Sequence, residues 1–297
     1  MDGRAHPFRV GSIDCVVLDD GRFTYDAATF FVTAPPGEVG AALAAHGVTT
    51  GRISTPYTCL LVDTGRHRVL VDTGGAGWDP GVGGLSRSLE AAGIRPEDVD
   101  VVVLTHGHPD HIGGTADPWG RPVFARARHV MAAAEWAFWT ASDLAGRVPD
   151  RFREIAAANL APIADRVDLV KGEEEIVPGV HALPSPGHTP GHLAIVVEDG
   201  GEELLYISDA ALHPIHLEHP AWCPRFDVDP VLATATRRML CERAVRRRSL
   251  VHAYHFDPYP CLGHVREHGD GWRWEPLPVP GPAPARRGDV TAVLRPA

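Results

Sequence analysis

The chain has 297 residues, enough for one large domain or two small ones, and 44% of them are hydrophobic, which suffices for a packed core. Its formal charge of −10 argues against a general electrostatic surface for nucleic acid. No basic leader with an apolar run opens the sequence, and no stretch approaches the ~20 apolar residues that cross a bilayer. We therefore expect a cytoplasmic protein that binds neither nucleic acid nor a membrane.

The first half of the chain alternates β-rich and helical patterns. Two β-rich runs at 57–62 and 69–71, around a polar turn, predict a hairpin that leads into a glycine-rich loop. Residues 85–94 have apolar positions at helical spacing and end in stop signals, so they predict a helix. The run Val99–Leu104 is short and continuously apolar, which favours a strand buried on both faces.

The middle of the chain is mostly helical in pattern. A short strand is predicted over residues 121–126. Helices are predicted over 128–146 and 150–166, separated by a glycine and a proline.

The later segments return to strands. GVHALPSPGHTPGHLAIVVE (179–198) and EELLYISDA (202–210) predict strands, as does SLVHAYHF (249–256). Between them, Asp229 as N-cap and a proline in the first helical position predict a helix over 229–248.

The interleaved segments predict one layered α/β domain over residues 1–275, with helices outside the sheets. A proline-rich tail, 276–297, is expected to be extended or loosely attached. The five cysteines are odd in number and never form a CxxC pair, so neither a disulfide framework nor a thiolate zinc site is indicated.

The stretch VVLTHGHPDHIGG (102–114) places three histidines and an aspartate within a few residues. His106 and His108 point to the same side of an extended segment, so both imidazoles can reach one metal ion. Asp110 and His111 follow a proline, where a turn redirects them, and they can hold a second ion. Imidazole and carboxylate without thiolate favour zinc, with iron and manganese as alternatives, and such open coordination is typical of catalytic sites.

The turn THGHPDH resembles the HxHxDH signature of the metallo-β-lactamase-fold hydrolases. The resemblance covers residues 57–274, because a histidine in a PGH turn, an aspartate at a strand end and a late histidine correspond to His188, Asp209 and His255. It implies an αββα sandwich of two mixed β-sheets flanked by helices. It also implies two divalent metal ions, held by His106, His108 and His188 and by Asp110, His111 and His255, with Asp209 bridging both.

Several of these assignments have competitors. His252 and His264 compete with His255, whose place at a strand end favours it. Asp72 resembles the family's aspartate that hydrogen-bonds the metal-binding loop, but a plain turn residue is nearly as well supported. His192 is expected to pack behind the ligands or to support them.

The resemblance implies a hydrolase in which a hydroxide bridging the two metals cleaves an ester, lactone or phosphotriester bond of a small-molecule substrate. Asp110 and Asp209 are its candidate catalytic residues. No GxSxG elbow or GxxxxGK[ST] loop supports a serine hydrolase or a nucleotide enzyme.

Two further segments, 18–31 and 256–276, resemble the branch containing methyl parathion hydrolase-like enzymes and N-acyl homoserine lactonases. One departure concerns the oxyanion. The lactonases have a tyrosine shortly after the bridging aspartate, and Leu212 stands in that place here.

Aromatic side chains are candidates for an apolar pocket around the metal centre. Trp78 lies in the glycine-rich loop, and the other candidates are Phe23, Phe30, Phe31, Trp136, Phe138, Trp139, Trp222 and Phe256. Most are expected to be ordinary core residues. The segment HPIHLEH (213–219) is expected to be a solvated loop, with lining of the site mouth as the alternative.

Three other functions compete. Glyoxalase II-like thioester hydrolysis uses a similar ligand set, although the C-terminal region lacks an obvious glutathione-binding domain. A sulfur dioxygenase of this fold would hold a single iron. A non-catalytic binding protein is disfavoured by the intact ligand set, and formation of a homo-oligomer stays open.

Overall fold

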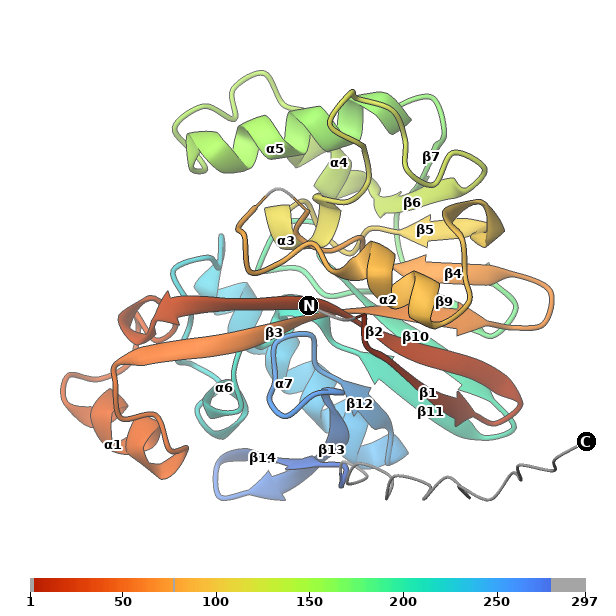
Figure 1. The fold of residues 1–297 in the computed structure, drawn as a ribbon. Helices are drawn as coiled ribbons and strands as arrows, with labels where there is room; N and C mark the ends of the chain where they lie inside the picture. Colours follow the sequence, from red (N-terminus) through yellow and green to blue (C-terminus); the bar gives the residue numbers. More distant parts are fainter. Residues whose placement is uncertain (1–2, 77, 279–297) are drawn as a thin grey trace, which may run out of the picture.

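A computed structural model describes residues 3–76 and 78–278 of the chain, and Figure 1 shows its ribbon. Two seven-stranded sheets form its centre. In spatial order, the first sheet contains β1 (Ala5–Val10), β2 (Ile13–Asp26), β3 (Arg52–Asp63), β4 (Arg68–Val71), β5 (Val101–Val103), β6 (Arg128–Ala132) and β7 (Val167–Val170). The second contains β14 (Gly271–Pro276), β13 (Leu262–His268), β12 (Leu250–His252), β11 (Glu202–Tyr206), β10 (Leu193–Asp199), β9 (Val180–Pro184) and β8 (Glu174–Val177).

Both sheets are mixed, as the αββα expectation requires. In the first sheet the pairs β4–β5, β5–β6 and β6–β7 are parallel, whereas the pairs β1–β2, β2–β3 and β3–β4 are antiparallel. In the second sheet the pair β11 and β12 is parallel and the other pairs are antiparallel. The helices are α1 (Glu38–Ala45), α2 (Leu85–Ala91), α3 (Pro109–Ile112), α4 (Ala133–Trp139), α5 (Asp150–Leu160), α6 (Ile215–Glu218) and α7 (Pro230–Arg247).

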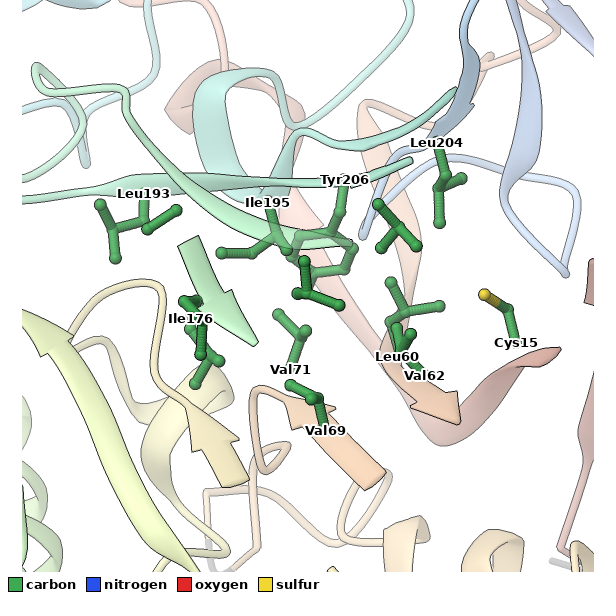
Figure 2. Close-up of a cluster of buried hydrophobic side chains, with 14 of the residues drawn as sticks. Cys15, Leu60, Val62, Val69, Val71, Ile176, Leu193, Ile195, Leu204 and Tyr206 are labelled. Carbon is green, nitrogen blue, oxygen red and sulfur yellow. The ribbon is translucent and has the colours of Figure 1, made fainter. Parts of the chain in front are cut away.

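The central core lies between the two sheets, and Figure 2 shows part of it. Side chains alternate across β3, so Leu60 and Val62 enter this core while Cys59 and Leu61 face the outer layer. The second sheet contributes residues such as Ile195 to the same core. A strand with two apolar faces is expected where a sheet is covered on both sides.

Helices cover the outer face of each sheet. Leu89 of α2, Trp139 of α4 and Leu160 of α5 join the cluster outside the first sheet. Leu240 and Ala244 of α7 pack against the outer face of the second. None of the described helices is long and apolar enough to cross a membrane.

Most predicted elements are present. The hairpin of β3 and β4, the helix α2, the buried strand β5 and the helices α5 and α7 all lie within or around the predicted ranges. Asp229 caps α7 as expected, since its side chain accepts a hydrogen bond from the Leu232 amide. The predicted tail over 276–297 lies, from residue 279 on, outside the described residues.

Two predictions in the middle of the chain were wrong. Residues 121–126 form turns with a single bridge at Pro122, and the strand is β6, over residues assigned to a helix. The alanine-rich run from residue 131 favours a helix locally. As a strand, however, β6 forms parallel backbone hydrogen-bond pairs with both β5 and β7. Tertiary pairing therefore overrides local propensity, and α4 begins only at Ala133.

The topology brings several loops to one edge of the sandwich. Parallel strands end at the same edge, so the segments after β4 and β5 lie together. In the second sheet the same holds for the segments after β11 and β12. The loop between β9 and β10 completes this edge, where the candidate site lies.

Candidate metal centre

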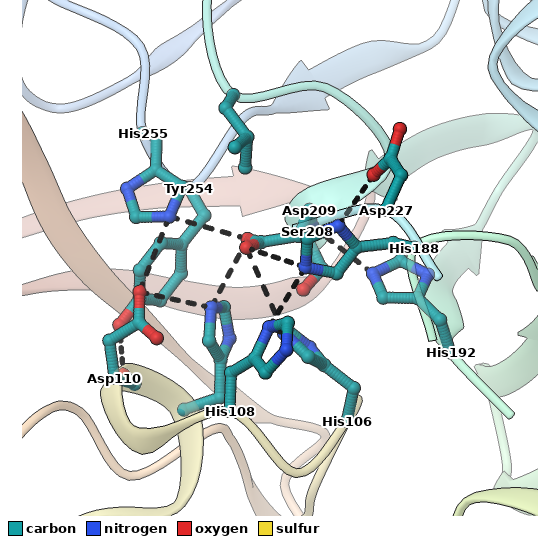
Figure 3. A network of polar contacts seen from close by, with 12 residues as sticks. His106, His108, Asp110, His188, His192, Ser208, Asp209, Asp227, Tyr254 and His255 are labelled. Atoms are coloured by element: carbon teal, nitrogen blue, oxygen red, sulfur yellow. Dashed lines mark hydrogen bonds and ion pairs between the residues drawn. The ribbon is translucent and has the colours of Figure 1, made fainter. Parts of the chain in front are cut away.

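Seven side chains from four segments converge at this edge, and Figure 3 shows most of them (His106, His108, Asp110, His188, Asp209 and His255). They form two groups, and within each group one ligand atom per residue lies within 4.8 Å of every other. The first group contains His106, His108, His188 and Asp209, and the second contains Asp110, His111, Asp209 and His255. Asp209 belongs to both groups, as a bridging residue must.

The histidine turn after β5 supplies four of the seven residues. His108 ends the extended part with φ −71° and ψ 151° and stands at the N-cap of α3. Pro109 then begins this single helical turn, which directs Asp110 and His111 to the second group. The predicted redirection at the proline is therefore confirmed.

His188 lies in a tight loop that requires a glycine on either side of it, at positions 187 and 191. Gly187 has φ +130°, and a Cβ there would lie 2.2 Å from the Ala233 amide nitrogen of α7. Gly191 packs equally closely on α4, with 2.2 Å from an ideal Cβ to the Glu135 amide nitrogen. Any larger residue at either position would displace the loop that carries the imidazole.

The remaining two residues follow β11 and β12. Asp209 lies in a short 3-10 turn, Ser208–Ala210, whose first residue has a left-handed φ of 44°. His255 follows β12 and joins the second group. The two competitors lie elsewhere, because His252 bonds to the Thr58 hydroxyl and His264 bonds to the Ser249 carbonyl.

In the first group, three ring nitrogens point at one another. His108 Nδ1 lies 3.0 Å from His106 Nε2 and 2.9 Å from His188 Nε2. Asp209 Oδ2 lies 3.3 Å from His188 Nε2. Three imidazoles cannot all satisfy one another by hydrogen bonds, since each neutral ring has one donor and one acceptor.

In the second group, two carboxylates face two imidazoles. His111 Nε2 lies 3.1 Å from Asp209 Oδ1 and 3.6 Å from Asp110 Oδ2. His255 Nε2 lies 3.4 Å from an oxygen of each carboxylate.

Buried polar atoms without partners test whether a metal fits here. Within residues 3–76 and 78–278, His111 Nε2 and Asp209 Oδ1 are buried and have no hydrogen-bond partner of acceptable geometry. Leaving such a buried atom unpaired costs about 1–3 kcal/mol of folding free energy. A further group that accepts the lone pairs of these atoms would remove this cost. A cation fits, and the nitrogen and oxygen donor sets suit a borderline divalent metal.

The far nitrogen of three imidazoles is anchored, which fixes the tautomer. Nδ1 of His188 donates to Asp227 at 2.8 Å, and Nδ1 of His111 donates to Asp72 at 2.8 Å. Nδ1 of His255 donates to the Pro56 carbonyl at 3.1 Å. In each neutral ring, Nε2 then directs a lone pair into the cluster.

Asp72 supports the metal-binding loop, as the resemblance implied. Its carboxylate accepts hydrogen bonds from the amide and hydroxyl of Thr105 and from the Tyr206 hydroxyl, besides His111. His192 supports the cluster from behind, because its Nε2 accepts from the Asp209 amide at 3.1 Å. Neither residue is a plain turn or core residue.

Two buried carboxylates escaped the sequence analysis. The Asp227 carboxylate accepts a hydrogen bond from the His188 ring. Its other oxygen accepts one from the Arg237 guanidinium of α7, at 3.4 Å. Glu135 of α4 accepts hydrogen bonds from the amides of Gly107 and Gly191, so it ties together the two loops that carry His106, His108 and His188. Only their tertiary neighbours distinguish them from ordinary acidic residues.

Burial and neighbouring charges perturb the titration of the cluster. Burial would lower the pKa of His188, but hydrogen bonds to Asp209 and Asp227 raise it to about 9. Burial and the nearby His188 lower the pKa of His108 to about 3. The pKa of Asp209 lies well below its ordinary value, because His111 and His255 outweigh the effect of burial.

A cavity of about 270 Å³ opens onto the cluster. It is lined by four cluster residues, His108, Asp110, Asp209 and His255, and by Phe23, Tyr25, Phe30, Trp78, Pro149, Phe152, Leu212 and Phe226. Of the aromatic candidates, Phe23, Phe30 and Trp78 line this cavity, whereas Phe138 and Trp139 pack beneath the first sheet and Phe256 beneath the second. Tyr25, Phe152 and Phe226 were not predicted.

The segment His213–His219 is not the solvated loop that was expected. Residues 215–218 form the helical turn α6, and His216 is fully buried. Its ring accepts from the Leu212 amide and contacts the Phe30 carbonyl at 2.8 Å. Pro214 precedes the turn as its N-cap and so does not interrupt it.

The chain belongs to the metallo-β-lactamase superfamily, whose family model matches residues 54–246, more than half of the chain. The expected family, fold and class of enzyme, a hydrolase of this superfamily, are thereby confirmed. Among curated relatives, an N-acyl homoserine lactonase of a Bacillus species is 26% identical over 78% of this chain and 88% of its own length. A probable metallo-hydrolase of Mycobacterium tuberculosis is 34% identical over 52% of this chain and 56% of its own length.

Solved structures agree with this family. AidC, a dizinc quorum-quenching lactonase solved with a bound product, is 25% identical and has a TM-score of 0.85, over 94% of this chain and 99% of its own. A hydrolase of the same superfamily, AbOPH, has a TM-score of 0.86 at 24% identity, over 95% of this chain and 99% of its own, which shows the shared fold.

Proposed function

We propose that the cluster binds two divalent metal ions, zinc before iron or manganese, and that the protein hydrolyses an ester, lactone or phosphotriester bond of a small, uncharged substrate. One observation carries this proposal. Seven side chains form two groups that share Asp209, at the floor of a largely aromatic cavity.

The ligand assignment follows the two groups. We assign the first ion to His106, His108 and His188, the second to Asp110, His111 and His255, and Asp209 to both. When bound, such a pair of metal ions would lower the pKa of a water molecule toward neutrality, so that hydroxide is the nucleophile and no protein side chain is needed for that role, and it would polarise the oxygen of an ester-like bond.

The chain's own residues bind and orient the substrate. Of the described residues that line the cavity, none is a lysine or arginine, and most are aromatic or aliphatic. Such walls favour a neutral, apolar substrate, and they disfavour the anionic glutathione moiety of a glyoxalase II substrate. Asp110 and Asp209 are the two carboxylates in the wall. We propose that one of them takes up the proton that the attacking water gives up and passes it to the leaving oxygen as the ester-like bond breaks.

The relatives support a lactone as the first substrate to examine. Both the Bacillus relative and AidC are described as lactonases, and AidC is described as dizinc. The five described cysteines are free and buried, as is usual in a reducing compartment, and we propose a cytoplasmic location.

Metal quantification combined with a substrate screen tests the proposal. We expect about two divalent ions per chain, and metal-dependent turnover of at least one of an aryl ester, an N-acyl homoserine lactone and a phosphotriester. One iron per chain with oxygen consumption would instead indicate a sulfur dioxygenase. Exclusive turnover of a glutathione thioester would indicate a glyoxalase II-like enzyme.

Ligand variants provide the matched test. His106→Ala and Asp209→Ala should abolish metal-dependent hydrolysis. The circular dichroism spectrum of each variant should remain that of the folded, unmodified protein. His264→Ala, which removes a histidine of β13 outside the cluster, should leave turnover unchanged. Unchanged turnover in either ligand variant would refute the assignment.

A further inference from the structure

At position 212 the cavity wall has no hydrogen-bond donor. Leu212, three residues after Asp209, lines the wall with an aliphatic side chain. Hydrolysis of an ester or lactone builds negative charge on the former carbonyl oxygen, and a positioned donor stabilises that charge. Such a donor must therefore come from another residue that lines the cavity.

Tyr25 is the phenol in this wall, and it comes from a different part of the fold. It lies near the end of β2, beside β3, and Figure 1 shows these two strands side by side. Its ring is fixed by contacts with Phe23, Phe30 and Phe226, at centroid distances of 4.6, 5.1 and 5.9 Å.

The phenol lies on the side of the second group. Tyr25 Oη lies 2.5 Å from Tyr57 Oη, and the Tyr57 ring packs edge-on against His255 with centroids 5.1 Å apart. The other indole or phenol donor that lines the cavity, Trp78 Nε1, is closed off from solvent. Among the described lining residues, Tyr25 is thus the uncharged hydroxyl that remains as a candidate donor.

The hydroxyl pair has a defined direction. Tyr57 is fully buried, and among the described residues Tyr25 Oη is the one hydrogen-bond partner of its hydroxyl. Since a buried hydroxyl proton needs an acceptor, Tyr57 donates to Tyr25. The hydrogen of the Tyr25 hydroxyl is then left to point into the cavity.

We propose that Tyr25 is a catalytic residue that donates a hydrogen bond to the carbonyl or phosphoryl oxygen of the substrate, and that Tyr57 is the positioning residue that orients it. This inference rests on the proposed function. As the oxygen of water bonds to the carbonyl carbon, the π electron pair moves onto the carbonyl oxygen, and the Tyr25 hydroxyl stabilises that charge. The phenol keeps its proton throughout. The proton of the water goes to the carboxylate of Asp110 or Asp209 and from there to the leaving oxygen, as the electron pair returns from the former carbonyl oxygen and the bond to the leaving oxygen breaks.

Tyrosine-to-phenylalanine variants test the role of the hydroxyls. Tyr25→Phe should lower kcat about 10- to 100-fold with KM changed less than about threefold, because the lost hydrogen bond forms to developing charge. Tyr57→Phe should lower kcat less. The double variant should match Tyr25→Phe, because Tyr57 acts through Tyr25. Losses that multiply in the double variant would contradict the positioning role.

Two controls separate the hydroxyl from packing. Tyr259→Phe removes a hydroxyl that bonds to the Val17 carbonyl outside the cavity, and it should leave kcat unchanged. Phe226→Leu alters the same wall without removing a donor and leaves the closer contacts of Phe23 and Phe30 with the Tyr25 ring in place, so it should raise KM more than it lowers kcat. Metal content and melting temperature of Tyr25→Phe should equal those of the unmodified protein.

A binding measurement keeps the inference separate from the proposed function. n-Butylphosphonate, a non-hydrolysable tetrahedral anion, should bind the metal-loaded protein about tenfold more tightly than it binds Tyr25→Phe in calorimetry. Equal binding, or equal kcat in an active enzyme, overturns the role of Tyr25 while leaving the metal-dependent hydrolase intact. If the unmodified protein turned over none of the esters, lactones or phosphotriesters, the proposed function itself would be refuted.

Discussion

His188 Nδ1 lies 2.8 Å from Asp227 Oδ1, and the guanidinium of Arg237 lies 3.4 Å from the other oxygen of the same carboxylate. All three side chains are buried. Arg237 also donates to the carbonyls of Ala210 and Pro220, so it fixes Asp227 to the segment that follows Asp209. This chain of contacts orients the imidazole of His188 toward the cluster from outside it.

Asp227→Asn should weaken metal binding about 10- to 100-fold, because the amide removes the charge that orients His188 and presents a donor to either the imidazole or the guanidinium. Competition with a chromophoric chelator measures this affinity. Asp229→Asn is the matched control, since asparagine caps a helix as well as aspartate does and Asp229 only caps α7. Equal metal affinities in the two variants would show that Asp227 does not support the site.

The metal-free protein should lose stability between about pH 6.5 and 9. The folded pKa of His188 is about 9, and that of His111 is raised because Asp209 and Asp110 outweigh burial. A raised folded pKa contributes stability that is present below the unfolded value and is lost as the pH rises through the folded value. His106 and His108 have lowered pKa values in the fold and lose their protons near pH 6.5 in the unfolded chain, so they oppose the trend only at the lower end of this range and not above about pH 7.5.

Thermal unfolding with and without metal checks this dependence. The melting temperature of the chelated protein should fall as the pH rises from 6.5 to 9. In the loaded protein the metal replaces these protons, so the fall should be absent, and metal addition at pH 7.5 should release protons into a weak buffer. A chelated protein whose melting temperature rises over this range would contradict the charge state of His188.

The cluster of seven side chains could be predicted because its chemistry is local in the sequence. Three of the histidines and Asp110 lie in one short turn, and His188, Asp209 and His255 stand at strand ends next to recognisable motifs. Parallel strands then bring such ends together without further information. The strand β6 was missed for the opposite reason, since its pairing partners lie outside the segment.

Asp227 and Tyr25 could not be predicted, because their roles depend on partners far away in the sequence. Asp227 meets His188 across 39 residues, and Tyr25 meets Tyr57 across the β2–β3 pair. Nothing in RFDVDP or RFTYDA distinguishes these side chains from a helix cap or a strand residue. The pairing of strands and the packing of α7 determine both contacts.

Glu135→Gln should destabilise the fold by about 1–3 kcal/mol. Oε1 of Glu135 accepts from the Gly107 amide at 2.9 Å and the Trp139 indole at 2.6 Å, and Oε2 accepts from the Gly191 amide at 2.8 Å. A glutamine places its NH₂ group against an N–H in either orientation, so at least one buried donor loses its acceptor.

Denaturant unfolding measures the loss as a shift of the midpoint at constant slope. Glu154→Gln, an exposed change of the same type on α5, is the control and should leave the midpoint within error. Because Glu135 ties the histidine turn to the His188 loop, its variant should also bind metal more weakly than the control does. A Glu135 variant with the midpoint and the metal affinity of the control would show that these two loops hold their positions without the carboxylate.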